Sequence, residues 1–314
     1  MVGRKVGIVG AGFVGATAAY SLTMTGACHE VVLYDINADI AKGKAIDIGQ
    51  STSYAPKGTI VTAAEDASGL KDCDIIVITA GVPRRSEMTR ADLLMINAKI
   101  MKDVVWNIMK YSPNAIILCV SNPLDIMSYV IHKMTGWNRN RIIGMAGALD
   151  GARMAYQINQ KVGYGSGQIR AMLIGDHGSN MIPLPEISAV GGVPLNQLVT
   201  KKDMEDIISR TKDGGAEIVK HLGTSAYYAP GRAISVMVEA ILDDSRIVMP
   251  SSVMLDGEYG YKDITVGVPV VLGANGIEKI IELELDEETK AKFKISVDSI
   301  KEGIEILEEN GFFE

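Results

Sequence analysis

Residues 5–15 read KVGIVGAGFVG, a short apolar run followed by the glycine pattern Gly10, Gly12 and Gly15. The run predicts a buried strand and the residues after it predict a helix, so the glycines lie at a strand-to-helix turn. There the first glycine permits a tight bend, the second lets the backbone approach a pyrophosphate, and the third allows helix and strand to pack closely. The pattern alone is weak evidence, but the order strand, turn, helix favours a dinucleotide site at a helix N-terminus.

A carboxylate follows the second predicted strand, EVVLYD, at Asp35. It lies 20 residues after Gly15, where a carboxylate can accept hydrogen bonds from the ribose hydroxyls of adenosine. The same charge repels a 2′-phosphate, and Ile36 and Asn37 follow without an adjacent Arg. The sequence therefore predicts NAD, rather than NADP, as the cofactor.

Val/Ile-rich runs alternate with helical segments through the first half of the chain, which is typical of a parallel sheet covered on both faces. The second half combines long helices, a strand QIRAMLIGDHG at 168–178, and an antiparallel meander at 245–285. We predict an α/β protein: an N-terminal doubly wound parallel sheet of the Rossmann type that binds NAD, residues 1–144, and a C-terminal α+β catalytic domain with antiparallel strands, residues 145–314.

The composition argues against several classes of partner. The chain has 314 residues and a formal net charge of −7, without a basic run, which argues against nucleic-acid binding. Its apolar runs are too short to cross a bilayer, and the first strand begins too near Met1 to leave room for a targeting peptide. Cys28, Cys73 and Cys119 are odd in number and far apart, which indicates buried, reduced thiols. We expect a cytoplasmic protein with no membrane partner.

One of the four histidines stands apart from the others. His177, in GDHGSN, follows the apolar run AMLIG and lies between two glycines, so its ring can project into a cleft. We expect the remaining three to be solvated or structural: His29, His132 and His221. From its position alone, His177 is open to either a structural or a catalytic interpretation.

Asp150 and Arg153, in LDGAR, are three residues apart and share one face of a predicted helix. They form either a surface ion pair of little energetic value or part of a site. Oxidation of an alcohol by NAD needs a base, a cation to polarise the carbonyl and a clamp for the substrate. These residue types could supply such groups.

Short motifs along the chain resemble those of one family. GAGFVG, the strand-end Asp35, AGVPRRSEMTR, VSNPLD, LDGAR, GDHG and SAYYAPG occur in this order. Together they are similar to the lactate/malate dehydrogenase family over essentially the whole chain, and within it to the malate-specific members that resemble lactate dehydrogenase. The resemblance implies reversible, NAD-dependent oxidation of malate to oxaloacetate, a step of the tricarboxylic acid cycle. A lactate-type or broad 2-hydroxyacid dehydrogenase is the alternative.

The resemblance also implies roles for individual residues. His177 would donate and accept the proton, and Asp150 would hold its ring. Arg153 would bind the substrate carboxylate with a two-point fork, and Arg90 would polarise the carbonyl from a closing loop. Asn122 would contact both substrate and cofactor. The remaining implied cofactor-binding residues are Gly10, Gly12, Gly15, Asp35, Asn97 and Val120, and no metal is implied.

The family's substrate-discriminating position falls on Arg84, where malate enzymes typically have Arg and lactate enzymes have Gln. Arg85 fits a solvated surface charge, and it would replace Arg84 if the register were shifted by one residue. Ser225 and Ala226 fit a small pocket wall that admits a longer diacid. The chain departs from the family at two positions: it has Ser179 where the family usually has Asp, and Gly151 where Ser is commoner. We expect both departures to affect local loop geometry more than activity.

Two interpretations outside the family compete with it. Tyr129 and Lys133 match the YxxxK pattern of short-chain dehydrogenases, but they lie in an apolar helical stretch and the glycine pattern differs from that class. A non-catalytic NAD sensor would need no proton relay, so the set of His177, Asp150, Arg153 and Arg90 argues against it. By analogy with the family we also expect a homo-oligomer, a tetramer rather than a dimer, with apolar helices forming the contacts.

Overall fold

The computed structural model describes residues 4–55, 57–83 and 88–314. Within them, a nine-stranded sheet runs in the order β14-β13-β12-β6-β5-β4-β1-β2-β3. The strands from the first half pair in parallel, and strand order reverses between β1 and β4. They are β1 (Lys5–Val9), β2 (Glu30–Tyr34), β3 (Ile60–Ala64), β4 (Ile75–Ile78), β5 (Ile116–Cys119) and β6 (Ile142–Gly144).

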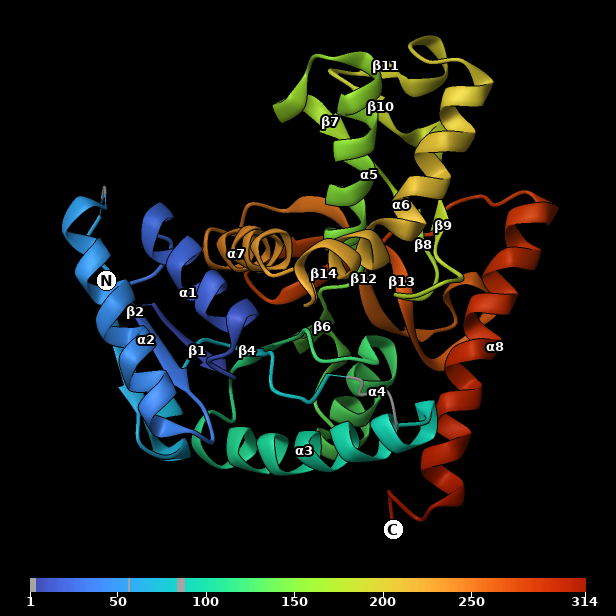
Figure 1. The fold of residues 1–314 in the computed structure, drawn as a ribbon. Coiled ribbons are helices and arrows are strands. Elements are labelled where there is room, and N and C mark those ends of the chain that lie inside the picture. The colour runs from blue at the N-terminus through green and yellow to red at the C-terminus, as the bar shows by residue number, and fades with distance from the viewer. Residues whose placement is uncertain (1–3, 56, 84–87) are drawn as a thin grey trace.

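Helices connect these parallel strands and cover both faces of the sheet, as right-handed crossovers require. On one face α1 packs against α2 and α7, and on the opposite face α3 packs against α4 (Figure 1). The bounds are α1 (Phe13–Thr25), α2 (Ala38–Ser51), α3 (Arg90–Tyr111), α4 (Leu124–Thr135) and α7 (Tyr228–Leu242). The predicted Rossmann-type arrangement is confirmed.

The α1 helix lies close to its neighbours because its contact face is made of small residues. Gly15, Ala18 and Ala19 are buried. Where α7 crosses α1, a Cβ on Gly231 would lie 2.6 Å from Cγ2 of Thr17, so the two helices approach to a distance that only glycine allows. The helix ends at Gly26 in the left-handed region, with a φ of 63°, a conformation that glycine adopts without steric cost.

The second half of the chain adds antiparallel strands to the same sheet. The strand β12 (Ile247–Asp256) joins β6 where Ser252 lies opposite Gly144, and β13 (Lys262–Gly273) and β14 (Gly276–Ile280) follow as the predicted meander. The helices α5 (Gly147–Val162) and α6 (Lys201–Leu222) form an upper lobe with two small sheets, and α8 (Glu287–Glu309) runs along one side (Figure 1). The predicted boundary at residues 144 and 145 falls between β6 and α5 and stays a prediction.

The single strand predicted at 168–178 is wrong. The segment forms two short strands in different sheets, β7 (Ile169–Arg170) and β8 (Leu173–Ile174). Between them, the amide of Met172 donates to Oγ of Ser188 instead of joining a ladder, so each half pairs with a different strand. The strand β8 pairs with β9 (Ile182–Pro183). The strand β7 pairs with β10 (Ala189–Val190), and β10 pairs on its other side with β11 (Val193–Pro194).

Short 3₁₀ helices connect many of these elements. They lie at Thr52–Tyr54, Ala67–Leu70, Arg139–Arg141, Ser166–Gln168, Pro185–Ile187, Leu195–Gln197 and Glu258–Gly260. All three cysteines are free and buried, as predicted, and burial raises the pKa of each thiol to about 12.

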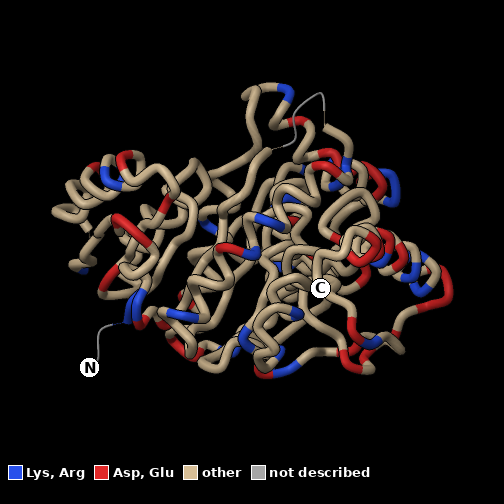
Figure 2. Tube along the Cα trace, turned by 90° about the horizontal axis from the view of Figure 1, so that it is seen from below, with Lys and Arg blue, Asp and Glu red and all other residues tan. Residues whose placement is uncertain are grey.

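Acidic and basic residues are intermixed over the described chain (Figure 2). On α8 they form ion pairs three and four residues apart, including Lys290 with Glu287 and Lys292 with Glu288. Opposite charges therefore offset each other locally along this helix. Among the described residues, no helix combines the length and apolar character needed to cross a membrane.

Candidate active site

The glycine turn lies at the carboxyl end of β1, beside the point where strand order reverses between β1 and β4. In open α/β sheets, ligands bind at this edge because loops on either side of the reversal leave a crevice. The segments that directly follow β4 and β5, residues 79–83 and 120–123, begin at the same edge, because β4 pairs in parallel with both β1 and β5. The sheet therefore brings the glycine turn, residues 79–83 and the start of VSNPLD together from distant parts of the first half.

The turn has the shape that a pyrophosphate needs. Gly10 has a φ of 104°, and a Cβ on Gly15 would lie 1.9 Å from the carbonyl oxygen of Gly10. A Cβ on Gly12 would meet no heavy atom within 4 Å, so this side of the turn is open. Gly12 is also the N-cap of α1 and provides no side-chain cap, which leaves the first-turn amides for a ligand. The residues present fit a dinucleotide.

Asp35 is tied to the same turn. Its Oδ2 accepts a hydrogen bond from the amide of Ala11 at 2.7 Å, and its Oδ1 accepts one from the amide of Asn37 at 2.9 Å. Each carboxylate oxygen has a further lone pair, so the group can hold the turn and still accept from ribose hydroxyls. This geometry is compatible with the predicted NAD site.

Asn97, on α3, links the two loops that follow β4 and β5. Its Oδ1 accepts from the amide of Val82 at 2.8 Å, and its Nδ2 donates to the carbonyl oxygens of Asn122 at 2.8 Å and Val82 at 3.2 Å. The side chain is buried, and its two amide hydrogens are taken within the chain. Asn97 and Asn122 are thus brought together, while Val120 is half-buried and packs against the core. Their cofactor-binding roles stay predictions.

His177, Asp150 and Arg153 form one connected group. Nδ1 of His177 lies 2.7 Å from Oδ2 of Asp150, and Nη1 of Arg153 lies 2.9 Å from Oδ1 of the same carboxylate. The side chains of Asp150 and Arg153 are only 3% and 17% exposed, so the alternative of a surface ion pair is wrong. Since an ionised carboxylate only accepts hydrogen bonds, Nδ1 carries the proton and Nε2 is left to exchange one with a ligand.

The surroundings of His177 favour its charged form. Burial by itself would lower the pKa of His177, but the charge and hydrogen bond of Asp150 outweigh that effect and raise the pKa above its ordinary value of 6.5. The segment is also held in place, because Gly175 forms two backbone hydrogen bonds with Gly267 of β13. A Cβ on Gly267 would lie 2.6 Å from the carbonyl oxygen of Gly175, so glycine permits this approach.

Arg153 is packed against α6 and has donors to spare. Its Nε is buried and has no hydrogen-bond partner among the described residues, which is costly unless a ligand or water accepts from it. A Cβ on Gly215 would lie 3.3 Å from Nη2 of Arg153, and the side chain also contacts the position of Gly214. Two glycines within α6 therefore leave room for a guanidinium that can bind a carboxylate.

Of the other predicted substrate-binding arginines, the structure describes Arg90 and not Arg84. Arg84 and Arg85 lie outside the described residues. Arg90 is exposed at the first residue of α3 and forms no hydrogen bond with His177, Asp150 or Arg153 in the part of the chain that the structure describes. Ser225 and Ala226 lie in the segment between α6 and α7. The roles of these residues stay predictions.

The residues of the competing short-chain pattern have structural partners. Nζ of Lys133 forms an ion pair with Oδ2 of Asp263 at 2.8 Å, and Tyr129 is buried in α4. His132, also in α4, is buried rather than solvated, and burial lowers its pKa to about 4. These observations favour structural roles for all three side chains.

Sequence reasoning missed one carboxylate beside His177. Asp125 is 5% exposed, in the first turn of α4, and its Oδ2 accepts from the backbone amide of His177 at 2.8 Å. Its Oδ1 accepts from Oγ of Ser252 at 2.6 Å. The signal was present: Asp125 is the only acidic residue in the run NPLDIMSYVI, whose apolar character predicts burial.

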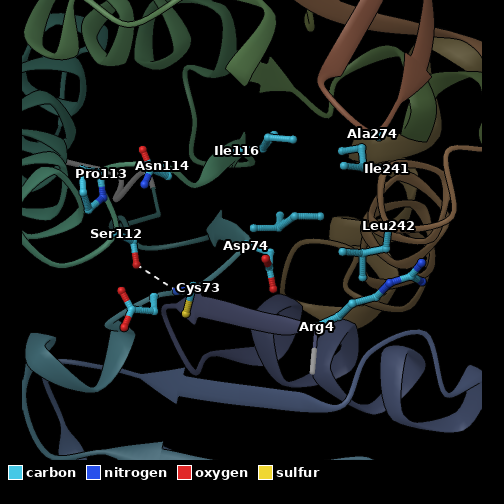
Figure 3. Close-up of a pocket in the computed structure, with 12 residues that line it drawn as sticks. Arg4, Cys73, Asp74, Ser112, Pro113, Asn114, Ile116, Ile241, Leu242 and Ala274 are labelled. Atoms are coloured by element: carbon cyan, nitrogen blue, oxygen red, sulfur yellow. Dashed lines mark hydrogen bonds between the residues drawn. The ribbon is translucent and has the colours of Figure 1, made fainter. Parts of the chain in front are cut away.

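A cavity of about 490 Å³ lies at the opposite, amino ends of the strands (Figure 3). Its lining includes Arg4, Cys73, Asp74 and Ser112, from the segments that precede β1, β4 and β5. Because the uncapped end of α1 and the His177 group lie elsewhere, this cavity is not the candidate site. Within the described ranges, no group of three or more His, Cys, Asp or Glu side chains is arranged to hold a metal ion.

Comparison with known proteins agrees with this geometry. Residues 4–144 match the model of the lactate/malate dehydrogenase NAD binding domain, and residues 147–310 match that of the lactate/malate dehydrogenase alpha/beta C-terminal domain. The chain is 55% identical to a malate dehydrogenase of Sulfurimonas denitrificans, covering 99% of this chain and 98% of the relative.

Solved structures of both malate and lactate dehydrogenases are similar to this chain. A malate dehydrogenase from Salinibacter ruber is 40% identical, with a TM-score of 0.93, and the match covers 98% of this chain and 100% of that one. A lactate dehydrogenase from Cryptosporidium parvum, in complex with lactic acid and NAD, is 34% identical, with a TM-score of 0.93 and coverage of 98% and 99%. With both family models matched across nearly its whole length, the chain belongs to the lactate/malate dehydrogenase family.

Proposed function

We propose that the chain catalyses the reversible, NAD-dependent oxidation of malate to oxaloacetate. The observation that carries the proposal is the Asp150 carboxylate, which bonds the His177 ring on one oxygen and Arg153 on the other. One buried group thereby aligns a proton acceptor with a carboxylate clamp. Curated relatives at 55% and 51% identity are named malate dehydrogenases, which supports malate as the substrate.

His177 performs the proton transfer. In the oxidation of malate, neutral Nε2 accepts the hydroxyl proton while the C–H hydride leaves, and Asp150 stabilises the imidazolium that forms. In the reverse direction, the imidazolium donates its proton to the carbonyl oxygen of oxaloacetate as the hydride arrives. The raised pKa of His177 suits the reduction of oxaloacetate, because it favours the imidazolium that donates the proton.

The remaining groups hold the reactants. NAD supplies the hydride acceptor, and it would be held by the Gly10–Gly15 turn, the first-turn amides of α1 and the carboxylate of Asp35. Arg153 binds the carboxylate next to the reacting carbon, with a fork that lysine does not reproduce. We assign Arg90 to polarisation of the carbonyl and Asn122 to contact with substrate and cofactor.

We assign the choice between malate and lactate to Arg84. Oxaloacetate has a second carboxylate at the end distant from its first one, and pyruvate has a methyl group at that end. A closed site that holds pyruvate would therefore leave Arg84 without a partner. Leaving one member of a buried charge pair alone costs roughly 3–5 kcal/mol. This cost corresponds to discrimination of about a hundredfold to several thousandfold in kcat/KM. The fold does not decide the question, since both solved relatives have a TM-score of 0.93.

Oxidation of NADH with a panel of 2-keto acids tests this function. We expect oxaloacetate to be the preferred substrate, and Arg84→Gln to move the preference towards pyruvate, with Arg85→Gln as the matched control. An equal or higher kcat/KM for pyruvate in the unaltered protein would favour the lactate-type alternative. An unchanged preference in Arg84→Gln would remove Arg84 from its assigned role.

We further propose that the protein works in the cytoplasm, in the tricarboxylic acid cycle, as a homo-oligomer, with a tetramer favoured over a dimer. Exposed Ile40 and Ile46 on α2 support a subunit contact. A groove beside α5 supports a second one, since it is lined by small or apolar residues that include Gly147, Ala148, Gly151 and Ala152. Light scattering coupled to size-exclusion chromatography gives the mass in solution, and a monomer of 33.6 kDa at micromolar concentration would contradict the assembly.

A further inference from the structure

Asp125 connects three elements beneath His177. Its Oδ2 accepts from the His177 amide at 2.8 Å, and its Oδ1 accepts from Oγ of Ser252 on β12 at 2.6 Å. Its own backbone carbonyl accepts from Oγ1 of Thr265 on β13 at 2.6 Å. Every polar atom of the carboxylate therefore has a defined partner, and one of those partners is the main chain that carries the proposed proton carrier.

The charges around His177 come from several elements. Asp150 and Arg153 face it from α5, Asp125 faces it from α4, and Asp176 precedes it in the same loop. Asp176 is bonded to the backbone amide and Nδ2 of Asn180, so it shapes the turn after His177. Asp150 is shared with the guanidinium of Arg153. Asp125 has no cationic partner other than His177 itself among the described side chains.

The burial of this carboxylate is costly to the fold. Burial raises the pKa of Asp125 from 3.8 to about 6, although hydrogen bonds from His177 and Ser252 favour its charged form. The folded state therefore binds the proton more tightly than the unfolded chain, and the group makes the protein less stable as the pH rises from 3.8 through about 6. An asparagine has nearly the same shape and no such cost. Groups that are held at the expense of stability are concentrated at functional sites.

We propose that Asp125 is a positioning residue for His177: it fixes the backbone of the proton carrier and supplies a negative charge that stabilises the imidazolium. Asp150 acts on the ring at Nδ1, and Asp125 acts from the backbone side. Two carboxylates on different helices therefore keep the ring charged in a buried site. The VSNPLD segment thus serves the proton transfer through Asp125, in addition to the contacts assigned to Asn122.

The test compares Asp125→Asn with the unaltered protein in an NMR titration of the histidine ring signals. The chain has four histidines, and the His177 signal is the one that disappears in His177→Ala. In Asp125→Asn the amide oxygen can still accept from the His177 amide, so the backbone stays in place while the charge is lost. We expect the His177 titration midpoint to fall by about one pH unit, the effect typical of a nearby opposite charge. A midpoint changed by less than about 0.2 overturns the proposal.

Asp286→Asn is the matched control. Asp286 is the N-cap of α8, where asparagine caps equally well, so the variant removes one carboxylate without disturbing the helix. We expect its His177 midpoint to be unchanged. A fall as large as that in Asp125→Asn would show a general charge effect and would overturn the proposal.

Ser252→Ala provides a second route if Asp125→Asn does not fold. Loss of the Ser252 hydroxyl leaves the Asp125 carboxylate with one donor fewer, so its charged form is less favoured and the His177 midpoint should fall in the same direction. An unchanged midpoint in Ser252→Ala overturns the proposal.

This proposal rests on the proposed function only for its catalytic meaning. The titration uses the protein without substrate, so a failure to reduce oxaloacetate would leave its result intact. If the protein is active, the pH profile of kcat/KM for oxaloacetate in Asp125→Asn should move to lower pH by the same amount as the NMR midpoint. A profile that superimposes on that of the unaltered protein would contradict the charge effect.

Discussion

At the amino ends of β1, β4 and β5, polar side chains are bonded to other parts of the same chain. Asp74 accepts from the amide of Lys5 at 2.8 Å, and Ser112 accepts from the amide of Cys73 at 3.0 Å. Arg4 forms an ion pair with Asp243. These contacts surround the cavity of Figure 3, and they serve the structure.

On the side of the carboxyl ends of the parallel strands, hydrogen-bond donors remain open. The first-turn amides of α1 have no side-chain cap, and Nε of Arg153 has no partner within the described chain. The helix N-termini point to this edge because each helix follows its strand, so their partial positive charges gather here. Strand polarity, and not the presence of a cavity, therefore locates the site.

The largest effect is expected at the carboxyl end, from His177→Ala. Loss of the proton carrier should lower kcat by about 10³-fold, within the range of 10² to 10⁴ typical of general acid–base groups. Affinity for NADH, measured by fluorescence titration, should stay within about twofold, since the glycine turn is untouched. A kcat reduced by less than about tenfold would remove His177 from its proposed role.

The glycine turn allows a paired test in which two alanine substitutions differ in kind. Gly12→Ala places its Cβ in open space, so stability should be unchanged while NADH binding weakens by about tenfold or more, because the methyl group occupies the path of the phosphates. Gly15→Ala drives its Cβ to 1.9 Å from the carbonyl oxygen of Gly10, so it should also lower the melting temperature. Calorimetry gives the melting temperature of each variant, and NADH titration gives its cofactor affinity. Equal NADH binding in Gly12→Ala and the unaltered protein would contradict the phosphate site.

Asp35→Ser tests the predicted ribose contact. Hydrogen bonds to a charged acceptor contribute about 1.5–3 kcal/mol, so NADH affinity should fall by about tenfold to a hundredfold. Affinity for NADPH should fall less or rise, because the charge that repels a 2′-phosphate is gone. Isothermal titration with both cofactors measures the ratio of the NADH affinity to the NADPH affinity. A ratio equal to that of the unaltered protein would contradict the role of Asp35.

The pH dependence should follow His177. Reduction of oxaloacetate needs the imidazolium, so its kcat/KM should fall by about tenfold per pH unit above the pKa of His177, which lies above 6.5. Oxidation of malate needs the neutral ring and should rise over the same range. Since the folded pKa is above the unfolded value, the His177–Asp150 pair stabilises the fold fully below 6.5, and this stability is lost as the pH rises through the folded pKa. If kcat/KM for oxaloacetate reduction and kcat/KM for malate oxidation changed with pH in the same direction, the proton transfer assigned to His177 would be contradicted.

The smallest effect on activity is expected at the amino end, from Ser112→Ala. Its Oγ accepts from Cys73 and donates to the carbonyl oxygen of Leu70, and the residue is buried. Leaving these groups unpaired should cost about 1–3 kcal/mol of unfolding free energy. Values of kcat and KM should stay within about twofold. If Ser112→Ala lost activity without losing stability, the assignment of a structural role to the amino ends of the strands would be contradicted.

Much of the fold could be predicted from local patterns. The apolar strands and the glycine turn between the first strand and the first helix follow from residues close together in the chain, and the structure confirms them. The strand at 168–178 was wrong because its division at Met172 depends on Ser188, a contact made only in the folded molecule. Local apolar character identifies a buried extended segment, but it does not identify which partner each half will pair with.

The site shows the same limit. His177 could be singled out by its place between two glycines, and Asp150 and Arg153 by their spacing on one helix. Asp125 was missed because 52 residues separate it from the His177 amide that it binds, and nothing in the spacing predicts that contact. Arg84 lies outside the described residues, so its role remains a prediction from the resemblance.

The amino-acid sequence by itself determined the alternation of strands and helices, the glycine turn with its acidic partner, and the order of motifs that identifies the family. These depend on backbone sterics and on hydrophobic periodicity, which act over a few residues. Only the tertiary structure decided that Asp150 is buried between His177 and Arg153 and that Asp125 lies beneath the same histidine. Electrostatic effects depend on distance and burial in three dimensions, and the positions of charged residues along a chain do not specify either one.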